Sequence, residues 1–338
     1  MALISVVVPA YNEEGVLPEF QRRLADVLNA LGHDSEIVYA NDGSTDRTIQ
    51  VLKELASQDP RVVIVDLSRN FGKEVALTAA IDHARGDAVV VIDADLQDPP
   101  ELIPLMVELW QSGNDVVFAQ RVSRAGESFI KKFTARMFYR IANRIGERPI
   151  PADTGDFRLM SRRAVDGLKQ LREKHRFMKG LFNWIGYNQI ALPYERAERF
   201  AGETKFNYWK LWNFSIEGFT SFTIAPLKLA TYLGLFSAFM AILYGLYMIA
   251  RTIFYGNTLP GYPSLIVVVL FLGGAQLMVL GIIGEYLGRT FNEVKGRPLY
   301  LIKEIIASQP TQPTQRTSDL RAGLPAAGNI AFLNAKDD

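Results

Sequence analysis

VVVIDADLQDPPE, residues 89–101, joins an apolar run to a cluster of acidic side chains. Asp93 and Asp95 follow four apolar residues, and Gln97 comes two positions later. Successive side chains alternate along a strand, so an extended backbone would turn both carboxylates to one side. Buried carboxylates need a compensating charge, and oxygen ligands suit Mg²⁺ or Mn²⁺. The segment therefore predicts a buried strand ending in a divalent-metal site, although acids of a solvated turn would give the same short pattern.

Strand and helix signals alternate along the first half of the chain. Strands are expected at residues 4–11, 36–42, 62–68 and 87–95, and helices at 16–31, 44–58 and 73–86. Ser44 and its neighbours offer capping side chains for the second helix, and Gly86 is expected to close the third. This alternation predicts an α/β fold with a mainly parallel sheet and helices on both faces. Ligands of such sheets bind at the carboxyl ends of the strands, which are polar in this chain.

Two long uncharged runs, residues 229–250 and 264–284, characterise the C-terminal third. Roughly 20 apolar residues span a bilayer as a helix, so we predict a transmembrane hairpin over residues 227–288; two core helices of a soluble protein are the alternative. Lysine and arginine flank the pair, whereas the expected connecting loop carries only Arg251. This bias predicts an integral protein of the inner (plasma) membrane with its catalytic domain and both termini in the cytosol.

The N-terminus is not expected to be a targeting signal. The first residues lack the basic region and cleavage site of a signal peptide and are expected to form a strand. The net charge of +1 does not indicate a nucleic-acid partner, and the absence of cysteine excludes disulfides and cysteine-ligated zinc. Residues 289–305 are expected to be a cytosolic segment, and the polar residues 306–338 a disordered tail.

Two segments suit a membrane surface. Residues 128–146 place apolar side chains at helical spacing beside a ridge of cations, which is typical of a helix in an anionic headgroup layer. A helix packed on the domain would also explain this pattern. Residues 207–226 contain Tyr208, Trp209 and Trp212, and such aromatic residues favour the membrane interface. We therefore expect both segments to lie at the membrane and to contact its lipids.

Six motifs together resemble the polyprenyl-phosphate glycosyltransferases of inverting GT-A type in glycosyltransferase family 2. In chain order they are SVVVPAYNEE, NDGSTDRT, RNFGKE, DADLQDPPE, GDFRLM and ERFAGETKF. The resemblance runs from about residue 4 to residue 303, and GNTLPGYPSL and GIIGEYLGR are most similar to the bactoprenol glucosyltransferase branch. It implies a Rossmann-like GT-A domain over residues 1–206.

The resemblance also implies an activity. The chain would transfer a hexose, glucose being favoured, from a nucleotide sugar such as UDP-glucose to undecaprenyl (polyprenyl) phosphate. The configuration would invert. The product would be a lipid-linked sugar donor for modification of a cell-surface glycan such as lipopolysaccharide. A homo-oligomer, with a tetramer among its forms, is the expected assembly.

Roles for individual residues on the donor side follow from the same resemblance. Mg²⁺ or Mn²⁺ would be held by Asp93, Asp95 and Gln97. Arg199 and Lys205 belong to a segment that closes over the diphosphate, although contact with lipid beside the membrane would also explain these cations. The residues expected to bind the nucleotide sugar are Pro9, Tyr11, Asn12, Glu13, Asp42, Arg69, Asn70, Lys73 and Asp93. For Asp42, a simple Asp-Gly turn is the alternative.

On the acceptor side, the resemblance assigns the lipid phosphate to Arg121, Lys131 and Arg136. Lys131 stands where the dolichyl-phosphate-mannose synthase pattern has arginine, so the contacts can differ, and a solvated basic face would explain the same cations. Asp156 matches the family's base or acceptor-orienting acid. A phosphate monoester is already anionic at neutral pH, so we expect Asp156 to position it in a single displacement. The catalytic residues would then be Asp156, Asp95 and Arg121.

Two other functions fit parts of the sequence less well. A processive polysaccharide synthase would carry a Gln-x-x-Arg-Trp segment before its spans, and this chain has none. A catalytically inactive membrane scaffold, or a partner of a flippase, would have no need of Asp93, Asp95 and Gln97. Turnover that depends on a divalent metal would separate the enzyme from the scaffold.

Overall fold

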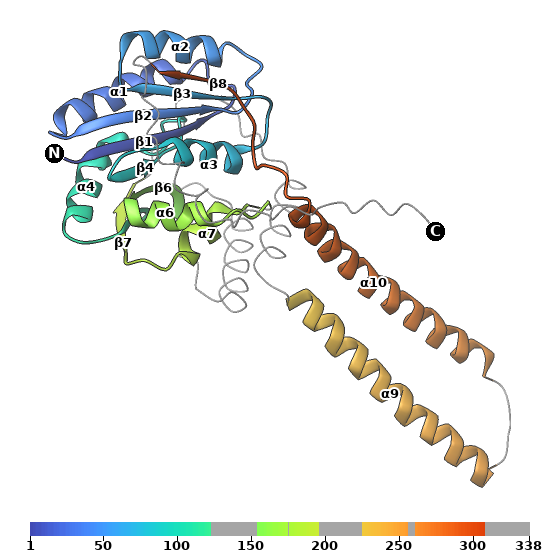
Figure 1. Cartoon of the computed structure of the whole chain (residues 1–338). Coiled ribbons are helices and arrows are strands. Elements are labelled where there is room, and N and C mark those ends of the chain that lie inside the picture. Colours follow the sequence, from blue (N-terminus) through green and yellow to red (C-terminus); the bar gives the residue numbers. More distant parts are fainter. Residues whose placement is uncertain (123–153, 175, 196–224, 256–260, 308–338) are drawn as a thin grey trace, which may run out of the picture. The chain divides into compact units, whose positions relative to one another are not determined.

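A mixed eight-stranded sheet organises the first part of the chain in this computed structural model, which describes residues 1–122, 154–174, 176–195, 225–255 and 261–307 (Figure 1). The spatial order of its strands is β7-β5-β6-β4-β1-β2-β3-β8. The strands are β1 (Leu3–Ala10), β2 (Asp34–Asn41), β3 (Val62–Leu67), β4 (Ala88–Val91), β5 (Val116–Arg121), β6 (Thr154–Ser161), β7 (Gln189–Tyr194) and β8 (Ile302–Ala307).

The centre of the sheet is parallel, as predicted. β1 pairs in parallel with both β2 and β4, and β2 pairs in parallel with β3. β6 runs antiparallel between β4 and β5, while β5 and β7 are parallel. The carboxyl ends of β1 to β4 therefore meet at one edge of the sheet, which we call the strand-end edge. The GT-A-like architecture expected from the sequence is confirmed.

Helices cover both faces of the sheet and create two apolar cores. One core contains buried side chains of α1 (Leu17–Ala30), α2 (Thr48–Gln58) and α4 (Ile103–Gln111), which follows the short helix η1 (Pro100–Leu102). The other core contains those of α3 (Lys73–His83), α6 (Arg162–Gln170) and α7 (Met178–Trp184). Because both faces are covered, the central strands are apolar on both sides, as in β4, whose four residues are all buried.

Three local expectations were wrong. α2 begins at Thr48, later than Ser44, and Asp46 Oδ1 rather than Ser44 accepts the first helical amide, that of Thr48, at 3.0 Å, while the Ser44 hydroxyl accepts the Asn12 amide. α3 ends at His83, where the backbone becomes extended at Ala84 rather than at Gly86. β4 ends at Val91, so strand alternation does not set the directions of Asp93 and Asp95.

The last strand, β8, was not expected. It lies beyond the predicted hairpin, pairs antiparallel with β3 and extends to Ala307. The Ser68 amide donates to the Leu301 carbonyl at 2.9 Å, and the Lys303 ammonium lies 3.4 Å from the Asp66 carboxylate. β8 thus completes the sheet with residues predicted only as a cytosolic extension and with residues 306 and 307, whose predicted disorder was wrong. The rest of the predicted disordered tail, from residue 308, lies outside the described residues.

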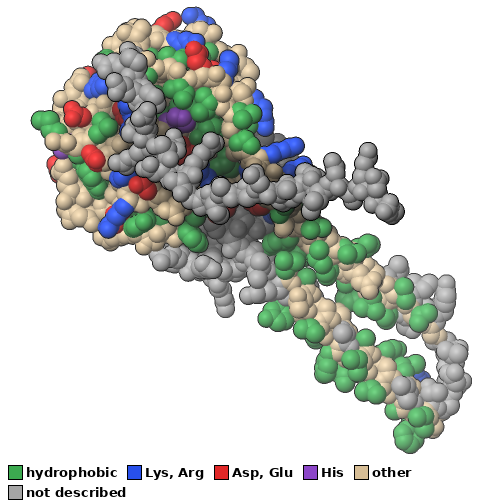
Figure 2. Space-filling model, in the orientation of Figure 1, with side chains coloured by type: hydrophobic (Ala, Val, Ile, Leu, Met, Phe, Trp, Pro, Cys, Tyr) green, Lys and Arg blue, Asp and Glu red, His purple; other side chains and the backbone are tan. Residues whose placement is uncertain are grey.

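Two long helices, α9 (Ala225–Tyr255) and α10 (Tyr262–Val294), form the C-terminal hairpin. Their segments Ala230–Tyr255 and Phe271–Val294 are long and apolar enough to cross a membrane. Apolar side chains cover their outer surfaces (Figure 2). Both helices are longer than the predicted runs, and Arg251 lies inside α9 rather than in the connecting loop. These are candidate membrane spans, since little of their apolar surface is buried within the protein.

Candidate active site

The loop after β1 and the loop after β2 hold each other at the strand-end edge. The Thr45 amide donates to Asn12 Oδ1 at 2.9 Å, and the Glu13 amide donates to Thr48 Oγ1 at 2.9 Å. Asn12 has a left-handed backbone with φ 54°, which asparagine tolerates better than most residues. Pro9 lies within β1, and the half-exposed Tyr11 begins the loop. Of the residues predicted to bind the nucleotide sugar, Asn12 and Glu13 thus also hold the loop after β1 in place.

Asp42 holds the loop after β3 in place. It is buried, and its two carboxylate oxygens accept the amides of Phe71 at 2.7 Å and Gly72 at 2.9 Å. Burial raises its pKa above the ordinary value, and the two amides and Arg69 oppose that shift. Asp42 thus fixes the loop after β3, a role beyond a simple Asp-Gly turn, and its predicted contact with the base stays a prediction.

Gly43 allows the loop after β2 to touch the loop after β3. Its φ is +61°, and a Cβ at this position would lie only 2.4 Å from the backbone carbon of Arg69. The Arg69 guanidinium lies 4.1 Å from the centre of the Phe71 ring and donates to the carbonyl of Asn70. Only glycine fits both the backbone angle and the space. The predicted residues Arg69 and Asn70 are therefore brought beside Asp42.

At the centre of the strand-end edge, Lys73 connects Asp93, predicted to bind the sugar donor, with Asp156, predicted to position the acceptor. Its ammonium lies 2.7 Å from Asp93 Oδ2 and 2.7 Å from Asp156 Oδ2. Lys73 begins α3, Asp93 follows β4, and Asp156 lies in β6, so three elements that are distant in sequence meet at one cation. Lys73 was predicted as a nucleotide-binding residue; its bridge between the two carboxylates was not predicted.

The charges of this cluster follow from burial and pairing. Burial alone would raise the pKa of Asp156, but Lys73 and Lys179 more than offset it, so the pKa lies well below its ordinary value. For Lys73, burial acts to lower the pKa and the two carboxylates raise it further than burial lowers it. Asp156 is therefore ionised at neutral pH. Its second oxygen, Oδ1, is buried and has no hydrogen-bond partner among the residues that the structure describes, so it is ready to accept one from a ligand.

Two charged residues behind this cluster were not singled out as site residues. Glu74 accepts the Met178 amide at 3.2 Å, and burial, together with nearby Asp156, raises its pKa to about 7. Arg158 is buried, donates to the carbonyls of Gly155 and Asp156, and stacks 3.8 Å from the centre of the Phe182 ring. Burial lowers its pKa to about 10. Both lie in motifs already quoted, RNFGKE and GDFRLM, but nothing in their spacing shows that they flank Asp156.

The residue types around Asp93 fit a divalent cation. Asp93, Asp95 and Gln97 offer carboxylate and amide oxygens, and the Lys73 ammonium beside Asp93 shows that this edge already accommodates a cation. Asp95 Oδ1 accepts the Gln97 amide at 3.2 Å across a tight turn. Within the described ranges, no group of three or more His, Cys, Asp or Glu side chains is arranged to hold a metal. A cation here would therefore need ligands from the substrate, as is common for Mg²⁺.

The turn that carries these ligands is strained. Leu96 lies between Asp95 and Gln97 and has a left-handed backbone with φ 58°. A bulky residue rarely adopts this angle, and such strain persists where surrounding contacts impose it. Leu96 is buried in the core beneath the turn, so its side chain holds the turn in place. The strain thus coincides with the predicted metal ligands.

Arg121, predicted to bind the acceptor phosphate, is the last residue of β5. Its guanidinium passes over Gly155, the residue before Asp156. It therefore lies at the same edge as Lys73 and Asp156. The remaining predicted cations, Lys131, Arg136, Arg199 and Lys205, lie outside the described residues.

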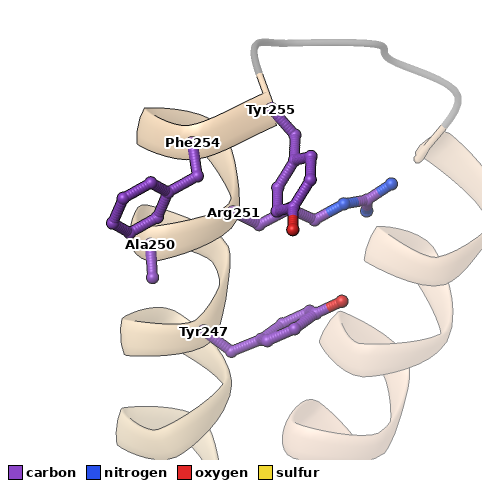
Figure 3. Close-up of a pocket in the computed structure, with 5 residues that line it drawn as sticks. All are labelled: Tyr247, Ala250, Arg251, Phe254 and Tyr255. Carbon is purple, nitrogen blue, oxygen red and sulfur yellow. The ribbon is translucent and has the colours of Figure 1, made fainter.

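A separate groove lies on α9 (Figure 3). It encloses about 420 Å³ and is lined by Tyr247, Ala250, Arg251, Phe254 and Tyr255. Figure 3 shows Tyr247, Arg251 and Tyr255 on the side of the neighbouring helix, with Phe254 on the other side. All five residues belong to a candidate membrane span, and none was predicted as a site residue. None of these five residues is acidic, so we place the chemistry at the strand-end edge.

Comparisons with known proteins agree with both parts of the chain. The family described as "Glycosyl transferase family 2" matches residues 5–168, and "GtrB C-terminal hairpin" matches residues 225–290. An uncharacterized glycosyltransferase of Synechocystis sp. is 52% identical over 89% of this chain and 95% of its own. A prophage bactoprenol glucosyl transferase homolog of Escherichia coli is 49% identical over 89% of this chain and 99% of its own.

Two further similarities differ in strength. The bactoprenol glucosyl transferase of Shigella phage SfII is 49% identical over 91% of this chain and 99% of its own. Among solved structures, glucosyl-3-phosphoglycerate synthase from Mycobacterium tuberculosis, in complex with Mn²⁺, UDP-glucose and phosphoglyceric acid, is 22% identical with a TM-score of 0.42. That likeness covers 64% of this chain and 76% of the synthase.

Proposed function

The chain belongs to glycosyl transferase family 2, and we propose that it transfers glucose from UDP-glucose to a polyprenyl phosphate, with undecaprenyl phosphate as the expected carrier. The observation that carries the proposal is the 49% identity to bactoprenol glucosyl transferases over 99% of their length. The matching C-terminal hairpin supports a substrate that resides in a membrane. The charged groups at the strand-end edge supply the chemistry.

The proposed reaction is a single displacement. A phosphate oxygen of the acceptor attacks the anomeric carbon of glucose on the face opposite the diphosphate. The bond from this carbon to the diphosphate breaks, and UDP leaves with the electron pair. The configuration at the anomeric carbon therefore inverts. The acceptor is already an anion at neutral pH and has no need of a base. Ionised Asp156 instead positions the reactants while Lys73 holds it beside Asp93. Holding two reactants in line is by itself a large contribution to rate.

We also propose that the donor diphosphate is bound through Mg²⁺ or Mn²⁺. Asp95 and Gln97, with Asp93, would hold the cation. The bound ion would supply positive charge to the leaving diphosphate. The carboxylate and amide oxygens of these three side chains support this proposal, because such oxygens are ligands that Mg²⁺ and Mn²⁺ prefer. Arg199 and Lys205 stay predicted contacts of the same diphosphate.

The proposed topology places the catalytic domain in the cytosol. β8, which follows α10, pairs with β3, so the sheet holds the chain both before and after the hairpin. Both ends of the hairpin must then lie on the same side of a membrane that it spans. The concentration of lysine and arginine outside the hairpin supports the cytosol as that side.

The function is tested with the full-length protein in lipid nanodiscs that contain undecaprenyl phosphate. Labelled UDP-glucose, UDP-galactose and GDP-mannose are supplied separately, and lipid products are identified by mass spectrometry. We expect one hexose per lipid from UDP-glucose. A polymer would favour a processive synthase, and no product from any donor would favour a scaffold.

The topology is tested by cysteine labelling, because the chain contains no cysteine of its own. Asn257→Cys places a thiol between the two helices, and Arg297→Cys places one after α10. With a membrane-impermeant maleimide on intact cells, only Asn257→Cys should react, and Arg297→Cys should react after permeabilisation. The reverse pattern would contradict the proposed orientation.

A further inference from the structure

A buried acid, Asp98, follows the predicted metal ligands but is not part of them. It is only 2% exposed, and it accepts a hydrogen bond from the hydroxyl of Tyr194, the last residue of β7. Tyr194 is also buried, and burial, together with Asp98, raises its pKa to about 12. The hydroxyl therefore keeps its proton and remains a donor to Asp98. A buried carboxylate is stable only with such partners.

The same hydroxyl has a second partner. Arg121 Nε donates to the Tyr194 oxygen at 3.4 Å. Arg121 and Tyr194 are register partners at the ends of the parallel strands β5 and β7, so the sheet itself brings them together. Asp98, Tyr194 and Arg121 thus form a continuous chain in which one hydroxyl donates to the acid and accepts from the guanidinium. The residues come from three separate parts of the sequence.

Gly155 has no side chain and so leaves space for the guanidinium of Arg121. A Cβ at Gly155 would lie 3.3 Å from Arg121 Nη2 and 3.9 Å from Asp98 Oδ2. The guanidinium therefore lies against the β6 backbone, next to Asp156. Burial opposes its charge, and Tyr194, Asp98 and Asp156 restore it, so the pKa of Arg121 stays above its ordinary value.

The two terminal nitrogens of Arg121 are available to a ligand. Within the part of the chain that the structure describes, the only hydrogen bond of this side chain is the one from Nε to Tyr194. A guanidinium held through Nε keeps its terminal N–H groups as a planar fork, which matches two oxygens of a phosphate. A freely rotating arginine would lose more entropy on binding the same anion.

We propose that Asp98 and Tyr194 are positioning residues that hold Arg121 in the orientation in which its terminal nitrogens bind the phosphate of the lipid acceptor. This inference rests on the proposed function, since it needs a phosphate acceptor. Tyr194 could alternatively serve only in packing, because its ring lies edge-on to Phe157 at a centroid distance of 6.5 Å. The hydroxyl and the ring can be tested separately.

Tyr194→Phe keeps the ring and removes the hydroxyl. We expect the KM for undecaprenyl phosphate to rise about tenfold, as for loss of one hydrogen bond to a charged group, while the KM for UDP-glucose changes less than twofold. Tyr187→Phe is the matched control, because this tyrosine packs against Gly167 and Arg163, away from the strand-end edge. It should leave both constants unchanged.

A double-mutant cycle then shows whether the hydroxyl acts through Arg121. Arg121→Lys keeps the charge but removes the fork, and adding Tyr194→Phe to it should raise the acceptor KM by less than twofold more. Asp98→Asn is the second route to the same chain and should raise the acceptor KM selectively. It also serves if Tyr194→Phe fails to fold, as judged by size-exclusion chromatography.

Three outcomes would overturn the inference. They are an unchanged acceptor KM in Tyr194→Phe, an equal rise in the KM of donor and acceptor, and fully additive effects in the double variant. These differ from failure of the proposed function, in which the unmodified protein would make no glucosylated lipid from UDP-glucose. The two ideas can therefore fail independently.

Discussion

The strand-end edge and the α9–α10 hairpin differ in how they carry charge. At the edge, Asp42, Asp98 and Asp156 are buried, and each has a named partner in another element. In the hairpin, one charged residue, Arg251, occurs between residues 229 and 284. Buried charge is tolerated where it is paired, and exposed apolar surface is tolerated where lipid replaces water. The protein thus combines a polar catalytic edge with a hairpin suited to lipid.

This contrast predicts that single acids at the edge decide activity. The largest effect is expected for Asp95→Ala, which removes a predicted metal ligand. Transfer should fall at least about a hundredfold, because loss of metal-based charge stabilisation is worth several kcal/mol. Glucosyl transfer is measured with and without EDTA, and EDTA should abolish activity of the unmodified protein.

Asp34→Ala is the control for this change, since Asp34 is an exposed acid at the opposite end of β2. It should retain full activity. Wild-type rates in Asp95→Ala, or transfer that resists EDTA, would remove the metal from the proposed mechanism.

A smaller effect is expected on stability from Glu74→Gln. The pKa of Glu74 is raised to about 7 in the folded protein, so the folded state binds its proton more tightly than the unfolded state. The associated stability is complete below about pH 4.5, the ordinary value, and is lost as the pH rises to about 7. Glutamine has no such titration, and it can still accept the Met178 amide.

The measurement compares thermal midpoints at pH 5 and pH 8. The unmodified protein should lose about 5 °C more than Glu74→Gln over this interval. Glu108→Gln, a change at an exposed position on α4, should behave like the unmodified protein. Equal losses in all three proteins would show that burial of Glu74 does not affect its titration.

The smallest effect is expected in the hairpin. Arg251 lies 23 residues after Lys228 in α9, a helical rise of about 35 Å, so under the proposed topology it lies near the opposite membrane surface. Arg251→Gln should leave transfer within twofold in nanodiscs. A loss as large as that of Tyr194→Phe would show that the groove of Figure 3 takes part in the reaction.

The sequence predicted the elements better than their ends. The four strands of the parallel centre and the three helices between them lie where periodicity placed them, within a few residues. The strand β8 was not predicted, because nothing in its local sequence indicates which strand it pairs with. Its partner β3 lies about 240 positions earlier in the chain. Among the capping side chains expected around Ser44, Asp46 accepts the Thr48 amide, whereas the Ser44 hydroxyl is used by the loop after β1.

The candidate site was predicted as residue types rather than as an arrangement. Asp93, Asp156 and Lys73 were all singled out, but their common ion pairs depend on β4, β6 and α3 meeting at one edge. Asp98 and Tyr194 were not singled out at all. They are 96 positions apart, and each becomes informative only beside the other.

The sequence by itself determined the alternation of strands and helices, the two apolar helices and the kinds of charged side chain at the strand ends. Those properties follow from periodicity and composition along short stretches of chain. Only the tertiary structure decided that Lys73 joins two acids, that Tyr194 joins Asp98 to Arg121, and that β8 returns to the sheet. The physical reason is that a buried charge is stable only beside its partner, and the partner is chosen by the fold rather than by distance along the chain.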